Sequence, residues 1–160
     1  MIASVDPTSG KPVTAIAAGA FRDNTSIETV LIPSTVREIG ASAFAGCTNL
    51  KTVTVYAGLE TIGNSAFSGC SALTSVTLPD GVRTFGENVF ADCPEMKISL
   101  PSSLERLGVN MFSTEALTTV TYRGTKAQWK ALIGNSSGWN GNSARVDVKV
   151  SSGESLRYPE

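Results

Sequence analysis

The chain has 160 residues, with 13 basic and 14 acidic side chains, three cysteines and no histidine. A net charge of −1 without basic runs argues against nucleic acid or a membrane surface as a partner. The lack of histidine removes the commonest general base and the commonest metal ligand, which argues against a hydrolase site. Apolar stretches are interrupted every few residues, so none reaches the roughly 20 residues of a membrane span.

The first residues indicate an incomplete first coil. Val5, Val13 and Ile16 are its apolar positions, and residues 6–12 interrupt it. Residues 1–6 lack the basic and long apolar stretches of a signal peptide, so the chain is either cytoplasmic or a mature or trimmed segment of an exported protein. Because no polar helix precedes this coil, we expect further coils or another domain before it in the natural protein.

Beyond this start the sequence repeats every 22–23 residues. One column of the repeat holds Phe21, Phe44, Phe67, Phe90 and Phe112, and another holds Ile16, Ile39, Ile62, Phe85 and Leu107. A fixed period of this length is typical of a solenoid, in which neighbouring coils stack to bury one core. We therefore expect about five coils over residues 1–123, with the phenylalanines forming an internal stack.

Each coil is predicted to contain three short pieces. The first alternates in polarity as a strand does, at residues 27–32, 50–55, 73–78, 96–100 and 117–122. Proline follows three of these strands, where the missing N–H ends the ladder at little cost, and Tyr56 takes that place once.

The second piece is a shorter extended segment closed by glycine, at Gly40, Gly63, Gly86 and Gly108. These glycines indicate a turn that needs a positive φ or a close backbone approach. Ala17 replaces the glycine in the first coil, so its turn is expected to differ. The third piece, around the phenylalanine, is expected to form one helical or 3-10 turn.

The period stops after Tyr122. Thr125 and Gln128 have capping-box spacing, and Trp129, Leu132 and Ile133 share one helical face, which predicts a short amphipathic helix. Strict alternation over residues 146–150 then predicts a strand. We expect this C-terminal cap, residues 124–150, to cover the open end of the stack, and residues 151–160 to form a flexible tail.

A resemblance to the BspA-like leucine-rich repeat family lies in residues 32–50, which read IPSTVREIGASAFAGCTNL. Residues 122–129, YRGTKAQW, resemble the terminal module that often follows such repeats. The resemblance covers residues 5–150 and implies a leucine-rich-repeat solenoid, mostly short β-strands with short helical turns and a C-terminal cap of one helix and one strand. It also implies a bacterial protein that is extracellular or on the cell surface. It brings no catalytic residues, so we expect no enzyme activity and no cofactor.

The three cysteines, Cys47, Cys70 and Cys93, share one column that Asn24 continues upstream. We interpret them as a structural column, in which a small polar side chain satisfies backbone groups of the turn. Disulfides between coils are an alternative, although parallel in-register side chains have poor geometry for them. A metal site is a further alternative, for which the sequence offers no second column of ligands.

A second column alternates in charge from coil to coil: Arg37, Glu60, Arg83 and Glu105. Opposite charges on neighbouring strands attract, so we interpret this column as a ladder that sets the register. A ligand-binding column would more naturally keep one sign.

The outward positions of the first strands carry mostly hydroxyl groups. β-Branched threonine suits an exposed sheet surface, so a structural role alone is one interpretation. The functional hypothesis is that this surface binds a protein or glycan on a host or neighbouring cell, through Thr52, Thr54, Ser75, Thr77, Ser99, Thr119 and Thr121. The surface offers no aromatic platform for a glycan, and Trp139 either is exposed in its loop or packs into the cap.

Two functions therefore remain open. The first is a non-enzymatic recognition or adhesion module. The second is a structural spacer in a larger surface protein, with no ligand of its own.

Overall fold

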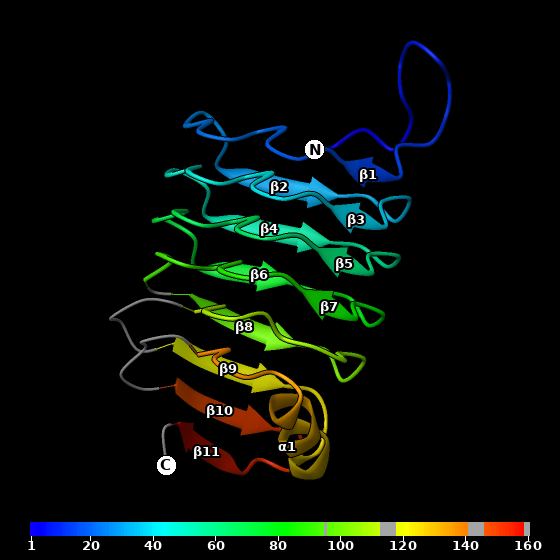
Figure 1. Ribbon diagram of the computed structural model, residues 1–160. Coiled ribbons are helices and arrows are strands. Elements are labelled where there is room, and N and C mark those ends of the chain that lie inside the picture. The colour runs from blue at the N-terminus through cyan, green and yellow to red at the C-terminus, as the bar shows by residue number, and fades with distance from the viewer. Residues whose placement is uncertain (95, 113–117, 141–145, 159–160) are drawn as a thin grey trace.

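Short strands lie one above another from the N-terminus to the C-terminus in a computed structural model of the chain (Figure 1). The structure describes residues 1–94, 96–112, 118–140 and 146–158. Within these residues the chain forms strands β1 to β11 and the helix α1. The stack of coils predicted from the repeat is confirmed.

The larger sheet carries the first strand of each coil. Its order is β11-β10-β9-β8-β6-β4-β2, and neighbours are parallel except for β10 and β11. The strands are β2 (Thr29–Ile32), β4 (Thr52–Val55), β6 (Ser75–Thr77), β8 (Lys97–Leu100), β9 (Thr118–Tyr122), β10 (Val146–Val150) and β11 (Ser155–Tyr158). Each strand predicted for a coil is present in shorter form, and the predicted final strand is β10.

The smaller sheet carries the second piece of each coil. Its parallel strands are β1 (Ala15–Ile16), β3 (Glu38–Ile39), β5 (Thr61–Ile62) and β7 (Thr84–Phe85). A bridge between Thr84 and Arg106 continues the sheet into the next coil. Among the strands of the coils, the paired residues are equivalent positions of the repeat, so the period of the sequence is the register of the sheets there.

The phenylalanine column forms the predicted internal stack. Neighbouring ring centroids lie 5.1 to 6.0 Å apart from Phe21 through Phe44, Phe67 and Phe90 to Phe112, with their planes at 10° or less. All except Phe21 are buried. Truncating such a buried ring costs about 3–5 kcal/mol, so this column is a main source of stability.

Two tryptophans of the cap continue the aromatic stack. Trp139 packs edge-on against Phe112 and Trp129, with ring centroids 6.3 and 5.2 Å apart. Trp129 lies 5.2 Å from Tyr122. Two positions were predicted for Trp139, exposed in its loop or packed into the cap. It is only 5% exposed, so it packs into the cap.

Helix α1 (Lys126–Gly134) closes the end of the stack as predicted. The backbone N–H of Gln128 donates to Thr125 Oγ1 at 3.2 Å, and the backbone N–H of Thr125 donates to Gln128 Oε1 at 2.8 Å. This reciprocal pair is the predicted capping box. Trp129 and Leu132 are buried, and Ile133 is partly buried.

The loop after α1 satisfies backbone groups of the last coil. The N–H of Leu107 donates to Ser136 Oγ at 2.9 Å, and the N–H of Asn110 donates to the Gly138 carbonyl at 2.7 Å. Ser136 is 3% exposed, the one buried polar residue in the part of the chain that the structure describes. The loop therefore takes the place of a further coil.

In the coils up to residue 94, the third piece consists of tight turns closed by bonds of the 3-10 type and does not continue as a helix, so of the two expected forms the 3-10 turn is the nearer one. The N–H groups of Ala43 and Ala45 donate to carbonyls three residues back, whereas those of Phe44 and Gly46 donate to the next coil at 2.8 Å. Every second N–H thus ties one coil to the next, which interrupts the succession of bonds that a helix requires.

The closing glycines are required by close packing between coils. A Cβ on Gly40 would lie 2.6 Å from the backbone nitrogen of Ala18, and one on Gly63 would lie 2.7 Å from that of Ala41. Positive φ occurs two residues later, as at Ser65 with φ 55°. Two reasons were predicted for these glycines. The close approach of the neighbouring backbone is confirmed, whereas a positive φ at the glycines themselves is wrong.

The N-terminal residues fold back beside the first coil. A bridge joins Val5 to Pro12, and the N–H of Ile2 donates to the Leu31 carbonyl of β2 at 3.0 Å. Ala17, at the closing-glycine position, is exposed, and within the described residues no earlier turn lies against it. This is why the first coil tolerates a Cβ there.

The prediction of a flexible tail at residues 151–160 is wrong for residues 155–158, which form β11. This strand pairs with β10 in antiparallel register, with Leu156 opposite Val148, and Leu156 is 9% exposed. Gly153, with φ 84°, lies in the short turn between the two strands. An antiparallel return needs only such a turn, and it covers the edge that β10 would otherwise expose. The domain boundary at residue 123 stays a prediction.

Replacing Gly63 by alanine is expected to lower the free energy of unfolding by about 1–3 kcal/mol, because the new Cβ would overlap backbone of the preceding coil. Urea unfolding followed by circular dichroism measures the loss. The matched control is Gly134→Ala, where nothing lies within 4 Å of an added Cβ, and it should leave stability unchanged or slightly raised. Equal losses in both variants would contradict the packing explanation.

Replacing Ser136 by alanine is expected to cost about 1–3 kcal/mol, because the buried N–H of Leu107 loses its acceptor. Hydrogen exchange should also show faster exchange of the Leu107 amide than in the unmodified protein. Ser137→Ala, at the neighbouring exposed position, is the control and should change neither quantity. Unchanged exchange at Leu107 in the Ser136 variant would show that this bond does not hold the cap.

Candidate functional site

The predicted contact residues lie together on one surface of the larger sheet. We name this surface, the outward side of β2, β4, β6, β8 and β9, the hydroxyl face. Its two columns pair in register and contain Thr29, Thr52, Ser75, Lys97 and Thr119, and Leu31, Thr54, Thr77, Ser99 and Thr121. All of these side chains are exposed or partly exposed. Whether they bind a ligand stays a prediction.

The hydroxyl face carries little charge. Thr52 Oγ1 donates to Thr29 Oγ1 at 3.2 Å, and Lys97 is the charged member of the two columns. Strand β10 extends the face beyond the coils and adds Asp147 and Lys149, in register with β9. From the sequence, β10 was expected only to cover the end of the stack. Its polar residues Asp147 and Lys149 alternate with buried valines as in the strands of the coils, and this pattern indicated that β10 also extends the sheet.

The hydroxyl face also carries an aromatic residue, Tyr56, which the sequence analysis did not place on this surface. It follows β4 two positions after Thr54, so the alternation of the strand places it on the same side. It is 53% exposed, and its N–H donates to the Ile32 carbonyl at 3.0 Å. The equivalent residues of the neighbouring coils, Pro33 and Pro79, have no N–H to donate. Tyr56 thus extends both the ladder and the face.

A shallow hollow of about 370 Å³ lies beside the Tyr56 ring. Its lining is Met1, Leu31, Pro33, Ser34, Tyr56 and Ala57. The expectation that the face has no aromatic platform is therefore wrong. The signal was the departure from proline in this column of the repeat.

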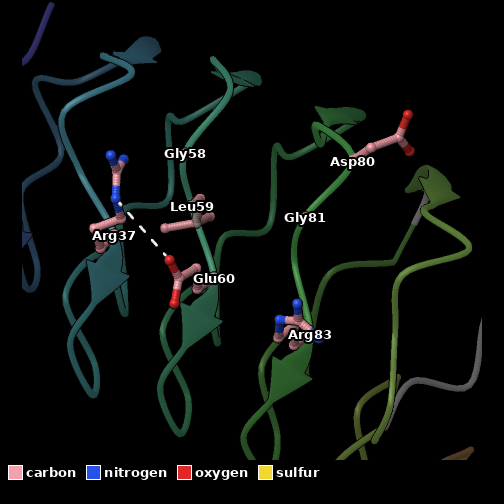
Figure 2. A pocket seen from close by; sticks show the side chains of 7 residues that line it. All are labelled: Arg37, Gly58, Leu59, Glu60, Asp80, Gly81 and Arg83. Carbon is pink, nitrogen blue, oxygen red and sulfur yellow. Dashed lines mark ion pairs between the residues drawn. The ribbon is translucent and has the colours of Figure 1, made fainter.

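Figure 2 shows a second hollow, of about 420 Å³, beside the smaller sheet. Arg37, Glu60 and Arg83 reach it from three successive coils, and Gly58 and Gly81 leave it open.

The charges at this second hollow are engaged within the protein. Arg37 Nε lies 4.0 Å from Glu60 Oε1, and Arg83 pairs with Glu105. The predicted attraction between neighbouring coils is confirmed for both pairs. Since all four side chains are more than half exposed, each pair contributes at most about 1 kcal/mol. The charges of this column therefore compensate one another between coils, and its role in setting the register stays an interpretation.

The cysteine column is structural, as the favoured interpretation predicted. All three thiols are free and buried, and each donates to the carbonyl of a phenylalanine in the preceding coil. The Sγ to O distances are 3.1 Å for Cys47, 3.2 Å for Cys70 and 3.3 Å for Cys93. Burial raises the pKa of all three thiols, that of Cys93 to about 12. These groups are therefore poor nucleophiles.

Neither a metal site nor a membrane-crossing helix is found among the described residues. No group of three or more His, Cys, Asp or Glu residues in residues 1–94, 96–112, 118–140 and 146–158 is placed to hold a metal ion. No helix in the same part of the chain has the length and apolar composition needed to cross a membrane.

These features define a leucine-rich-repeat solenoid with two parallel ladders and a stacked aromatic core. The sequence pattern of the BspA type leucine rich repeat region matches residues 14–133, in six copies. The chain therefore belongs to the BspA-type leucine-rich repeat family. This family typically consists of non-catalytic repeat modules.

Solved bacterial structures share this fold. The leucine rich repeat protein TpLRR of T. pallidum is 33% identical with a TM-score of 0.66, over 71% of this chain and 54% of that chain. A leucine-rich repeat protein from Bacteroides ovatus is 27% identical with a TM-score of 0.65, over 75% of this chain and 38% of that chain. The match thus spans about half or less of each of these proteins. A comparison with curated proteins found no match.

The buried thiols are expected to resist modification in the folded protein, because their thiolates are disfavoured and solvent does not reach them. Native protein mixed with Ellman's reagent at pH 8 should release almost no chromophore, whereas protein in 6 M guanidinium should release the equivalent of about three thiols. Rapid reaction of any thiol in the native protein would overturn the assignment of a buried structural column.

Proposed function

We propose that this chain is a non-enzymatic recognition module, extracellular or on a bacterial cell surface, that binds a protein or glycan through the hydroxyl face. The observation that carries the proposal is the in-register surface of threonine and serine on five successive parallel strands. A sheet of this kind presents many hydrogen-bonding groups on one broad surface at fixed spacing, which favours binding over chemistry.

The exposed location is supported by the family. BspA-type repeats are typical of bacterial surface proteins. The pneumococcal vaccine antigen PcpA has the same type of fold, at 24% identity and a TM-score of 0.51 over 76% of this chain and 39% of that chain.

The chemistry of the described residues supports a binding role over catalysis. The arginines and glutamates at the charged hollow are engaged in ion pairs, and the thiols are buried and protonated. Catalysis needs an exposed nucleophile or a titratable group poised near neutral pH, and the chain has no histidine to supply one.

The test is a glycan and extracellular-matrix array probed with the purified chain and with the triple variant Thr52→Lys, Thr77→Lys and Thr121→Lys. Three lysines on a nearly uncharged face should weaken any specific binding at this face by at least about tenfold, through lost hydrogen bonds and unpaired charge. Affinities of the hits are then measured by surface plasmon resonance.

The control carries the same added charge elsewhere. Thr48, Ser71 and Ser102 are exposed and lie outside the strands, so lysines at these positions should leave binding unchanged. Binding lost equally in both triple variants would indicate a non-specific charge effect and contradict the assignment of the face. Binding to none of the arrayed ligands would favour a structural spacer.

A further inference from the structure

We propose that the Tyr56 end of the hydroxyl face is a subsite for a neutral sugar ring, which packs on Tyr56 and bonds to the neighbouring hydroxyl groups. The inference rests on the proposed recognition function and narrows its ligand to an uncharged glycan. It is carried by the exposed ring, the adjacent hydroxyl columns, the size of the hollow and the absence of charged side chains in its lining.

The Tyr56 side chain is the aromatic platform. The residue is 53% exposed, although most large apolar side chains in the described part of the chain are buried. Its N–H is bonded to the Ile32 carbonyl, so the backbone that carries the ring is held by the sheet ladder. A rigid aromatic ring buries a large apolar area at low conformational cost, and one side of a sugar ring presents C–H groups that pack on such a ring.

Hydroxyl groups available to orient a sugar lie in the lining of the hollow and on the strand that leads to Tyr56. Thr54 is two positions before Tyr56 on the same strand face, and it pairs in register with Leu31 on one side and Thr77 on the other. Ser34 lines the hollow as well. An apolar platform flanked by a few hydroxyl groups is the usual composition of a small polar ligand site.

The electrostatics favour an uncharged ligand. None of the six side chains that line the hollow is charged. Arg37 donates to the carbonyl of Ser34, one of the lining residues, at 2.7 Å, and its Nε lies 4.0 Å from Glu60 Oε1, so it is already engaged. An acidic sugar would find no cationic side chain in this lining, and a carboxylate placed against the apolar side chains would be unfavourable.

The size of the hollow favours a sugar over a protein segment. At about 370 Å³ it lies within the range of small-ligand sites, roughly 300–1,000 Å³. A stable protein interface buries about 800 Å² on each partner, far more than one aromatic ring and its neighbours supply. Grooves that bind proline-rich peptides are lined by several aromatic side chains, whereas the described lining contains only Tyr56.

The test uses saturation-transfer NMR and an array of neutral hexose and N-acetylhexosamine oligosaccharides, with three variants of Tyr56. Tyr56→Ala should weaken binding by about tenfold or more, because the platform is lost. Tyr56→Phe should stay within about twofold of the unmodified protein, because the ring remains. Tyr56→Pro introduces the residue that Pro33 and Pro79 supply in equivalent coils, so it removes the ring while keeping a tolerated backbone residue.

The matched control is Val109→Ala, an exposed apolar position outside both sheets, which should not change sugar binding. Saturation transfer should mark the C–H groups of one sugar face in the unmodified protein and disappear in Tyr56→Ala. Thermal unfolding of each variant by circular dichroism confirms that the fold is kept.

Three outcomes would overturn the proposal. Sugar binding that survives Tyr56→Ala would place the site elsewhere. Binding of proline-rich peptides or proteins without any neutral sugar, lost in the triple-lysine variant, would refute this subsite and leave the recognition function standing. Binding of no sugar and no protein would refute both.

Discussion

The fixed distance between hydrogen-bonded coils is the constraint on which the rest of this structure depends. Backbone ladders hold neighbouring strands about 4.8 Å apart, and every coil must meet the next at this spacing. The phenylalanine rings stack at 5.1 to 6.0 Å because their backbones are held in this way. The same spacing leaves no room for a Cβ on Gly40 or Gly63.

A stack that bonds each coil to its neighbour leaves unsatisfied groups at its end, and the C-terminal segment supplies their partners. Ser136 and the Gly138 carbonyl accept N–H groups of the last coil, Trp139 continues the aromatic stack, and β10 with β11 extends the larger sheet. The cap therefore provides the hydrogen-bond acceptors, the aromatic ring and the strand that a further coil would provide, although its sequence does not follow the repeat. One result is that the larger sheet, and with it the hydroxyl face, extends beyond the repeats.

Features that recur in every coil could be predicted from the sequence, and features that occur once could not. The strands, the phenylalanine stack, the paired charges and the cysteine column all follow from periodicity, and the capping box follows from spacing. Ser136 and β11 occur only once, and their roles depend on backbone groups brought near by the whole stack. Tyr56 interrupts a proline column, and only the sheet shows that this exposed residue lies at the end of the hydroxyl face.

The alternating charges also bear on how such a protein can change length. The ion pairs join the coils two by two, Arg37 with Glu60 and Arg83 with Glu105. Duplication of a single coil would set two arginines or two glutamates side by side, whereas duplication of two coils would preserve the alternation. Adding or removing coils in pairs is thus electrostatically easier than adding or removing a single coil.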